Sequence, residues 1–213
     1  MKIIFGKNKV QFQNRPFIIV ITVAVIIVGS LASGFTGNDI EKEKHEAAKK
    51  IDSVASVTAF MDVYKVLMSP RCMNCHPSGD IPLQGDDSRV HTMSPIRGED
   101  GKGVYAMKCS NCHQPTNTPG LNKPPGNPKW GLPPAEMKMV FEGKSAHDLA
   151  VQIMDYNRNG HKNKTQLIEH ARDTLVKAGW NMGEGRKPPP LSYKQFVAAW
   201  DDWINKGGVA PKN

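Results

Sequence analysis

Two short stretches of the chain carry the same arrangement of cysteine and histidine. The first reads Cys72-Met73-Asn74-Cys75-His76 and the second reads Cys109-Ser110-Asn111-Cys112-His113. In a C-x-x-C-H sequence the two thiols can add across the two vinyl groups of one haem, while the adjacent imidazole binds the iron from one face. The two copies therefore predict two covalently attached haem c groups. The predicted thioether residues are Cys72, Cys75, Cys109 and Cys112, and the predicted iron ligands are His76 and His113.

Paired C-x-x-C sequences also occur in zinc sites and in thiol redox sites. A four-cysteine zinc ribbon has about 15–20 residues between its two pairs, whereas 33 residues separate Cys75 from Cys109. All 4 cysteines of the chain belong to the motifs, so none is left for a disulfide or a catalytic thiol elsewhere. Covalent haem is the preferred interpretation, with zinc or thiol chemistry as the alternative.

The motifs and their surroundings resemble the c-type cytochromes, over most of the chain after residue 55. The stretch from Gly101 to Cys109 is similar to that family's approach to its haem motif, and Pro82-Leu83-Gln84-Gly85 is similar to its proline-containing loop. Segments 77–85, 97–113 and 130–143 are similar to bacterial di-haem cytochrome subunits labelled as partners of molybdenum hydroxylases of the isoquinoline 1-oxidoreductase type.

The resemblance implies a mainly α fold, with cytochrome c-like helices and loops around two haems. A histidine that binds a metal usually donates its other ring N–H to a carbonyl or carboxylate. Pro82 and Pro119 each stand six residues after a motif histidine. By resemblance, their carbonyls are the expected acceptors, although the two prolines could equally be loop punctuation.

A second protein ligand on each iron would separate an electron carrier from a catalyst with an open iron. His170 shares a helical stripe with Leu167 and Ala171 and is expected to face inward, and His91 lies in the loop between the motifs. We therefore expect His91 and His170 as the second ligands. A methionine ligand on one haem, which would raise its reduction potential, is the alternative. The methionines considered are Met137, Met139 and Met182, and His147 and His161 are expected at the surface.

Helix signals lie on either side of a loop-rich middle. A capping-box pattern opens a stretch without Pro or Gly over residues 38–68, and further helices are expected over 145–156, 165–177 and 191–204. Between the motifs, Gly, Asp and Pro favour loops, and residues 114–134 hold seven prolines. There Trp130 is expected to pack against its surroundings or to donate a hydrogen bond to a haem propionate.

The first residues combine positive charge with an apolar run. Residues 1–16 carry four basic side chains, and Phe17 to Phe35 is a 19-residue stretch, close to the ~20 needed to span a bilayer. We expect residues 1–36 to be a signal or transmembrane segment, 37–58 a helical stalk and 59–213 a di-haem cytochrome c domain. The basic amino end predicts a domain on the periplasmic side of the inner membrane, either anchored there or soluble after signal cleavage.

Charge and composition limit the partners. The formal charge is +8, and the chain after residue 35 has 24 basic and 20 acidic residues, which four haem propionates would bring near neutral. No basic run with interleaved aromatics predicts nucleic-acid binding. The expected function is electron transfer between a redox enzyme or quinol-linked donor and an acceptor, with redox proteins as partners. The alternative is a haem enzyme, a peroxidase or small-molecule reductase, with one open iron.

Overall fold

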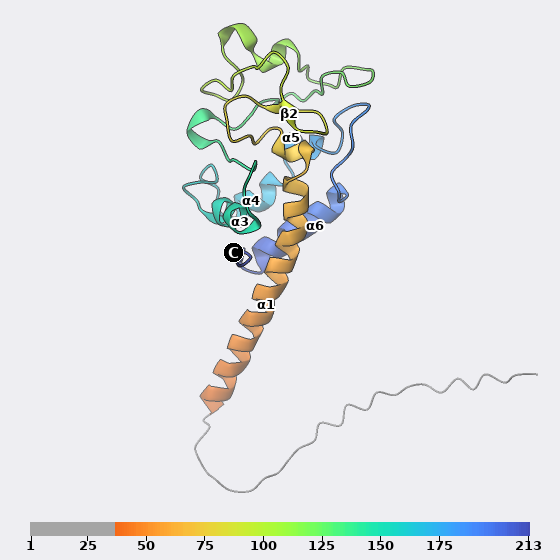
Figure 1. Ribbon diagram of the computed structural model, residues 1–213. Coiled ribbons are helices and arrows are strands. Elements are labelled where there is room, and N and C mark those ends of the chain that lie inside the picture. Colours follow the sequence, from red (N-terminus) through yellow and green to blue (C-terminus); the bar gives the residue numbers. More distant parts are fainter. Residues whose placement is uncertain (1–36) are drawn as a thin grey trace, which may run out of the picture.

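The computed structural model describes residues 37–213, and this part of the chain is mainly helical, as expected. A long first helix, α1 (Gly37–Leu67), projects from a head that contains the other elements (Figure 1). The helices of the head are α2 (Pro70–Met73), α3 (Ala146–Met154), α4 (Lys164–His170), α5 (Thr174–Ala178) and α6 (Tyr193–Asn205). Its shorter elements are β1 (Leu83–Gln84), β2 (Arg89–Val90) and the 3-10 turns η1 (Tyr105–Met107), η2 (Cys109–Asn111) and η3 (Ala135–Met137).

No helix between residues 37 and 213 is long and apolar enough to cross a bilayer. The predicted signal or anchor segment, residues 1–36, lies outside the described residues.

The core lies where the last helix crosses the first (Figure 1). Phe60 and Val63 of α1 are fully buried, and the Phe60 ring packs 4.5 Å from the ring of Trp203 in α6. Trp200 of α6 reaches in the other direction, where its Nε1 donates to the Leu167 carbonyl of α4 at 2.8 Å. This apolar contact holds the end of α1, and with it the first cysteine motif, in a defined position relative to α4.

The helix boundaries follow the capping signals of the sequence. Ser145 caps α3, and capping boxes open α4 at Asn163 and α6 at Ser192. The expected single helix over 165–177 is wrong, because it is divided into α4 and α5. The helix is interrupted at Asp173. The side chain of Asp173 accepts a hydrogen bond from the amide of Leu175 and so caps the start of α5.

The segment between the motifs consists mostly of loops, which confirms the expectation from its Gly, Asp and Pro content. Its one hairpin pairs β1 with β2, in the register Leu83 to Val90 and Gln84 to Arg89. The amide of Leu83 donates to the Asn74 carbonyl at 2.9 Å. The hairpin is therefore attached directly to the first motif.

Candidate functional site

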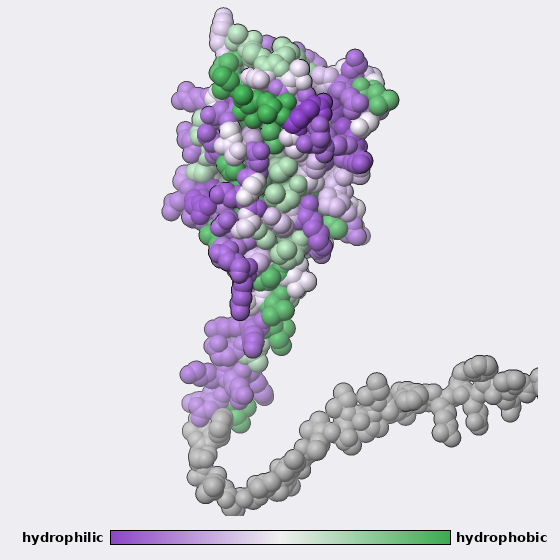
Figure 2. Space-filling view, viewed as in Figure 1, coloured by the Kyte–Doolittle hydropathy of each residue, from purple (hydrophilic) through white to green (hydrophobic). Residues whose placement is uncertain are grey.

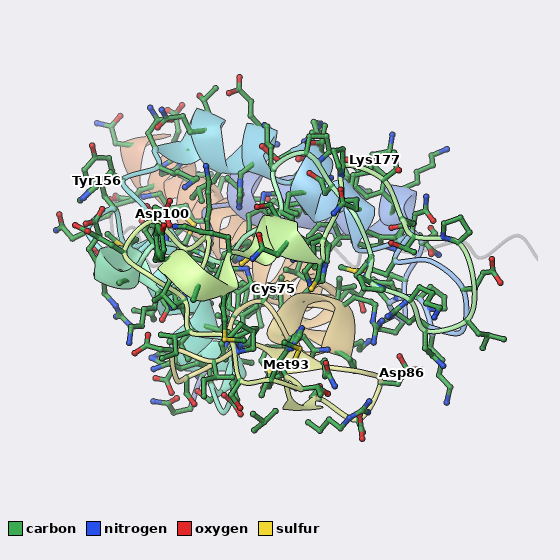
Figure 3. All side chains as sticks on the ribbon, turned by 90° about the horizontal axis from the view of Figure 1, so that it is seen from above. Cys75, Asp86, Met93, Asp100, Tyr156 and Lys177 are labelled. Carbon is green, nitrogen blue, oxygen red and sulfur yellow. The ribbon has the colours of Figure 1, made fainter. Side chains whose placement is uncertain are left out.

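Each C-x-x-C-H motif forms a single helical turn. In the first, the amide of Cys75 donates to the Cys72 carbonyl at 3.1 Å, and in the second the amide of Cys112 donates to the Cys109 carbonyl at 3.2 Å. A separation of three residues on a helical turn brings the two side chains of a pair to the same face. The first turn lies at the head end of α1, and Figure 3 looks down on this end with Cys75 near the centre. Both pairs are thus arranged to reach one edge of a planar group.

The cysteines of the first motif are neutral thiols. Burial raises the pKa of Cys72 to about 12 and that of Cys75 to about 11, and burial also raises the pKa of Cys109. Zinc binding and thiol–disulfide exchange both need the thiolate, which a raised pKa disfavours. Within residues 37–213 no three His, Cys, Asp or Glu side chains come together as a metal site. All four cysteines are free thiols, and Cys112 is the exposed one.

His76 is held on two sides by the segment 139–142. Its Nδ1 lies 2.7 Å from the carbonyl oxygen of Met139, where the chain turns through a left-handed φ of +47°. The Phe141 ring stacks on the imidazole at 3.8 Å with an interplanar angle of 8°, and the Phe141 amide donates to the His76 carbonyl at 2.9 Å. Because a carbonyl can only accept, Nδ1 carries the proton and Nε2 keeps its lone pair.

His113 has the same construction, made by the segment 125–130. Its Nδ1 lies 2.7 Å from the carbonyl oxygen of Pro125, and the Trp130 ring stacks on the imidazole at 4.2 Å with an interplanar angle of 9°. A Cβ at Gly126 would overlap the carbonyl oxygen of Thr116, so only glycine fits beside Pro125. The expectation that Trp130 packs against its surroundings is confirmed, and its packing partner is the motif histidine.

A second histidine and an arginine accompany each motif histidine. The pKa of His76 is lowered to about 4, chiefly by burial and to a smaller extent by the charges of His170 and Arg97. Burial also lowers the pKa of His113, and there the neighbouring charges are His91 and Arg186. The two sites therefore share five components: a motif histidine, a carbonyl acceptor, a stacked aromatic ring, a second histidine and an arginine.

The two expected second ligands lie at different sites. The rings of His91 and His113 have their centroids 6.2 Å apart with an interplanar angle of 61°. The charge of His170 contributes to the lowered pKa of His76, but the expected inward orientation of His170 is wrong. Leu167 and Ala171 are buried, whereas the His170 side chain is exposed, because α4 ends at His170 instead of continuing.

The expected acceptors of the motif histidines are also wrong. Met139 and Pro125, rather than Pro82 and Pro119, accept the hydrogen bonds from Nδ1 of the two histidines. The Pro82 carbonyl instead accepts from the amide of His91 at 3.0 Å. The sequence held no signal for either acceptor, because every residue has a backbone carbonyl and only the path of the loops selects one.

Three residues that contribute to the sites were not predicted from the sequence, Phe141, Arg97 and Arg186. Phe141 lies 65 positions after His76, and its stacking depends on the backbone contact between the two segments. Arg97 is 1% exposed and donates to the carbonyls of Gly79 and Pro133. A single arginine in a Gly-rich and Pro-rich loop was its only signal, and that signal does not specify burial.

The remaining candidate ligands have other contacts. Met139 supplies its carbonyl to His76, and its side chain packs against the hydrophobic core. The carbonyl of Met182 accepts from Arg186. His147 has its Nδ1 2.7 Å from the carbonyl of Pro211, and His161 is exposed with its ring 5.2 Å from that of Tyr156.

Comparison of the chain with family models, with curated proteins and with solved structures found no match.

Proposed function

We propose that this chain is a di-haem c-type cytochrome that passes single electrons between redox partners. The observation that carries the proposal is the repetition of one environment around His76 and His113. Each ring donates Nδ1–H to a carbonyl and stacks on an aromatic ring within 10° of parallel, at 8° and 9°. The C-x-x-C-H motifs predict two equivalent sites from the sequence alone. The matching environments of the two histidine rings support that prediction independently.

The residues at each motif fit the requirements of a covalently held haem. Cys72 and Cys75 would hold one group and Cys109 and Cys112 the other, with His76 and His113 presenting Nε2 to the two irons. Haem iron, when bound, supplies reversible one-electron oxidation and reduction. The carbonyls of Met139 and Pro125 would fix the tautomer and orientation of the two imidazoles and raise their basicity.

A short distance between the two sites would suit transfer of an electron between them. Burial is the main cause of the raised pKa of Cys75 and the charge of Cys109 adds to it, which supports a short distance between the two motifs. The first motif is built on the core beside α1, whereas Cys112 of the second is exposed. This arrangement supports an electron carrier with one site toward the interior of the head and one toward solvent.

The expected location and partners complete the proposal. An anchored or exported protein on the periplasmic side of the inner membrane would exchange electrons with a redox enzyme or a quinol-linked donor and with an acceptor. Two similar sites, each with a second histidine nearby, favour a carrier over a haem enzyme with one open iron.

Haem content after expression with a covalent haem maturation system tests the proposal. We expect intact mass and absorption to report two haems in the wild type and one in each of the variants Cys72→Ala/Cys75→Ala and Cys109→Ala/Cys112→Ala. His147→Ala, which changes a histidine bonded to Pro211 away from both motifs, is the matched control and should keep two haems. A colourless or zinc-containing wild type would overturn the proposal. A high-spin signal that responds to cyanide in the wild type would favour the enzyme alternative over the carrier.

A further inference from the structure

Beyond the two motifs, the structure brings one additional histidine against a motif histidine, and it comes from the side of the other motif. His91 follows the first motif in sequence but lies against His113 of the second. The inference from this contact rests on the proposed function, because it assigns a ligand to one of the two irons.

The spacing of His91 and His113 fits two imidazoles that share one metal ion. Two nitrogens that bind a metal from opposite faces are about 4 Å apart, and each ring centre lies about 1 Å further back, so the centres should be about 6 Å apart. The measured separation of the ring centroids is 6.2 Å. The Nδ1 of His91 lies 2.6 Å from the Thr92 carbonyl, so this ring, like that of His113, keeps Nε2 for a metal.

The hairpin explains how His91 reaches the second motif. Strand β1 is bonded to the first motif through the Leu83 amide and the Asn74 carbonyl, and β2 returns beside it. His91 directly follows β2, and its amide donates to the Pro82 carbonyl at 3.0 Å. The hairpin therefore starts at the first motif, and His91, the residue after β2, lies beside the second motif.

We infer that His91 binds the iron of the haem attached at Cys109 and Cys112, together with His113. That iron then has two histidine ligands, one from the motif and one that follows the hairpin. Loss of His91 opens this iron and leaves the other unchanged.

Single-haem proteins test the assignment by spin state. In Cys72→Ala/Cys75→Ala, which keeps only the second site, we expect a low-spin spectrum that becomes high-spin with His91→Gly and stays low-spin with His170→Gly. In Cys109→Ala/Cys112→Ala, His91→Gly should leave the spectrum unchanged. Added imidazole should restore the low-spin spectrum of the opened site, which a merely structural effect would not do. A second site that responds to His170→Gly, or that does not respond to His91→Gly, would overturn the assignment.

The two-haem protein gives a second measurement that does not depend on the cysteine variants. His91→Gly should convert one of the two haems to high spin in electron paramagnetic resonance. His161→Gly, at another exposed histidine, is the matched control and should convert neither. Low-spin haem at both sites in His91→Gly would contradict the assignment. A wild type without haem would instead contradict the proposed function.

Discussion

The hydrogen bond at Nδ1 fixes the tautomer of each motif histidine. Nδ1 of His76 and Nδ1 of His113 both lie 2.7 Å from a backbone carbonyl, although the two acceptors come from different loops. An imidazole whose Nδ1–H is donated to a carbonyl presents a lone pair at Nε2. Burial also lowers the pKa of both rings, which favours their neutral form at neutral pH.

One buried arginine connects the loops around the first motif. Arg97 is 1% exposed, and its guanidinium donates to the Asp80 carboxylate at 3.3 Å, to the Pro133 carbonyl at 2.6 Å and to the Gly79 carbonyl at 3.0 Å. Asp80 also binds Lys138 at 2.8 Å. One carboxylate therefore balances two cations, one of which is removed from water.

We predict that Asp80→Asn destabilises the protein in a pH-dependent way. The hydrogen bond from Lys138 holds the pKa of Asp80 below its usual range, with a further contribution from Arg97. A carboxyl with a lowered folded-state pKa stabilises at neutral pH, and this contribution is lost as the pH falls below about 4. The urea midpoint of Asp80→Asn should therefore be below that of the wild type at pH 7, and the difference between the two midpoints should shrink as the pH is lowered from 7 to 3.

Asp87→Asn is the matched control for Asp80→Asn. Asp87 pairs with Arg89, but both side chains are more than half exposed, at 61% and 60%. An exposed ion pair contributes little to stability, so the midpoint of this variant should equal that of the wild type at both pH values. A midpoint difference for Asp80→Asn that does not change between pH 7 and pH 3 would show that the ionised form of Asp80 does not stabilise the fold.

At the scale of elements, the crossing of α1 and α6 supports the first motif. Ser56 of α1 is fully buried, and its Oγ donates to the Trp203 carbonyl at 2.9 Å and accepts from the Val209 amide at 3.0 Å. This hydroxyl joins the helix that precedes the motif to the end of α6 and to the segment that follows it. The apolar contact of Phe60 with Trp203 adds to the same junction.

We predict that Ser56→Ala lowers the free energy of unfolding by about 1–3 kcal/mol, because the Val209 amide loses its acceptor and the Trp203 carbonyl keeps only the Gly208 amide as a donor. Thr58→Ala removes a hydroxyl from an exposed position two residues later, where it bonds only to the Val54 carbonyl. That control should change stability by no more than about 0.5 kcal/mol. Urea unfolding of both variants measures the difference, and equal effects would show that the junction contributes nothing.

At the scale of the whole molecule, α1 belongs half to the head and half to a stalk. Apart from two partly covered side chains, residues 38–55 are exposed, and the first fully buried position is Ser56. Ile51 and Val54 remain 69% and 63% exposed on the stalk, which projects from the head in Figure 2. Burial thus begins close to the expected boundary between residues 58 and 59.

We predict that hydrogen exchange changes abruptly within this one helix. An unsupported helix is marginal in water, whereas residues packed in the core open only with larger parts of the fold. Amides of residues 40–52 should therefore exchange much faster than those of 57–67, and the latter should match α6. Mass spectrometry of exchanged peptides measures this, and uniform protection along α1 would show that the stalk has a partner surface.

Local patterns were sufficient for much of the fold. The absence of Pro and Gly over 38–68 predicted α1, and the capping patterns at Ser145 and Ser192 lie at real helix starts. The two helical turns of the motifs likewise depend on neighbours in sequence. Capping, helical periodicity and the reach of two thiols to one group are short-range effects, so the residues themselves carry the signal.

The sequence by itself determined the two C-x-x-C-H motifs, the mainly helical fold and the pair of histidines to consider as second ligands. Only the tertiary structure decided which carbonyls hold His76 and His113, that Phe141 and Trp130 stack on them, and that the His91 ring lies beside that of His113. Those contacts join positions as many as 65 residues apart, His76 to Phe141. They depend on the paths of loops whose backbone groups are alike in every residue, so no side-chain pattern could specify them.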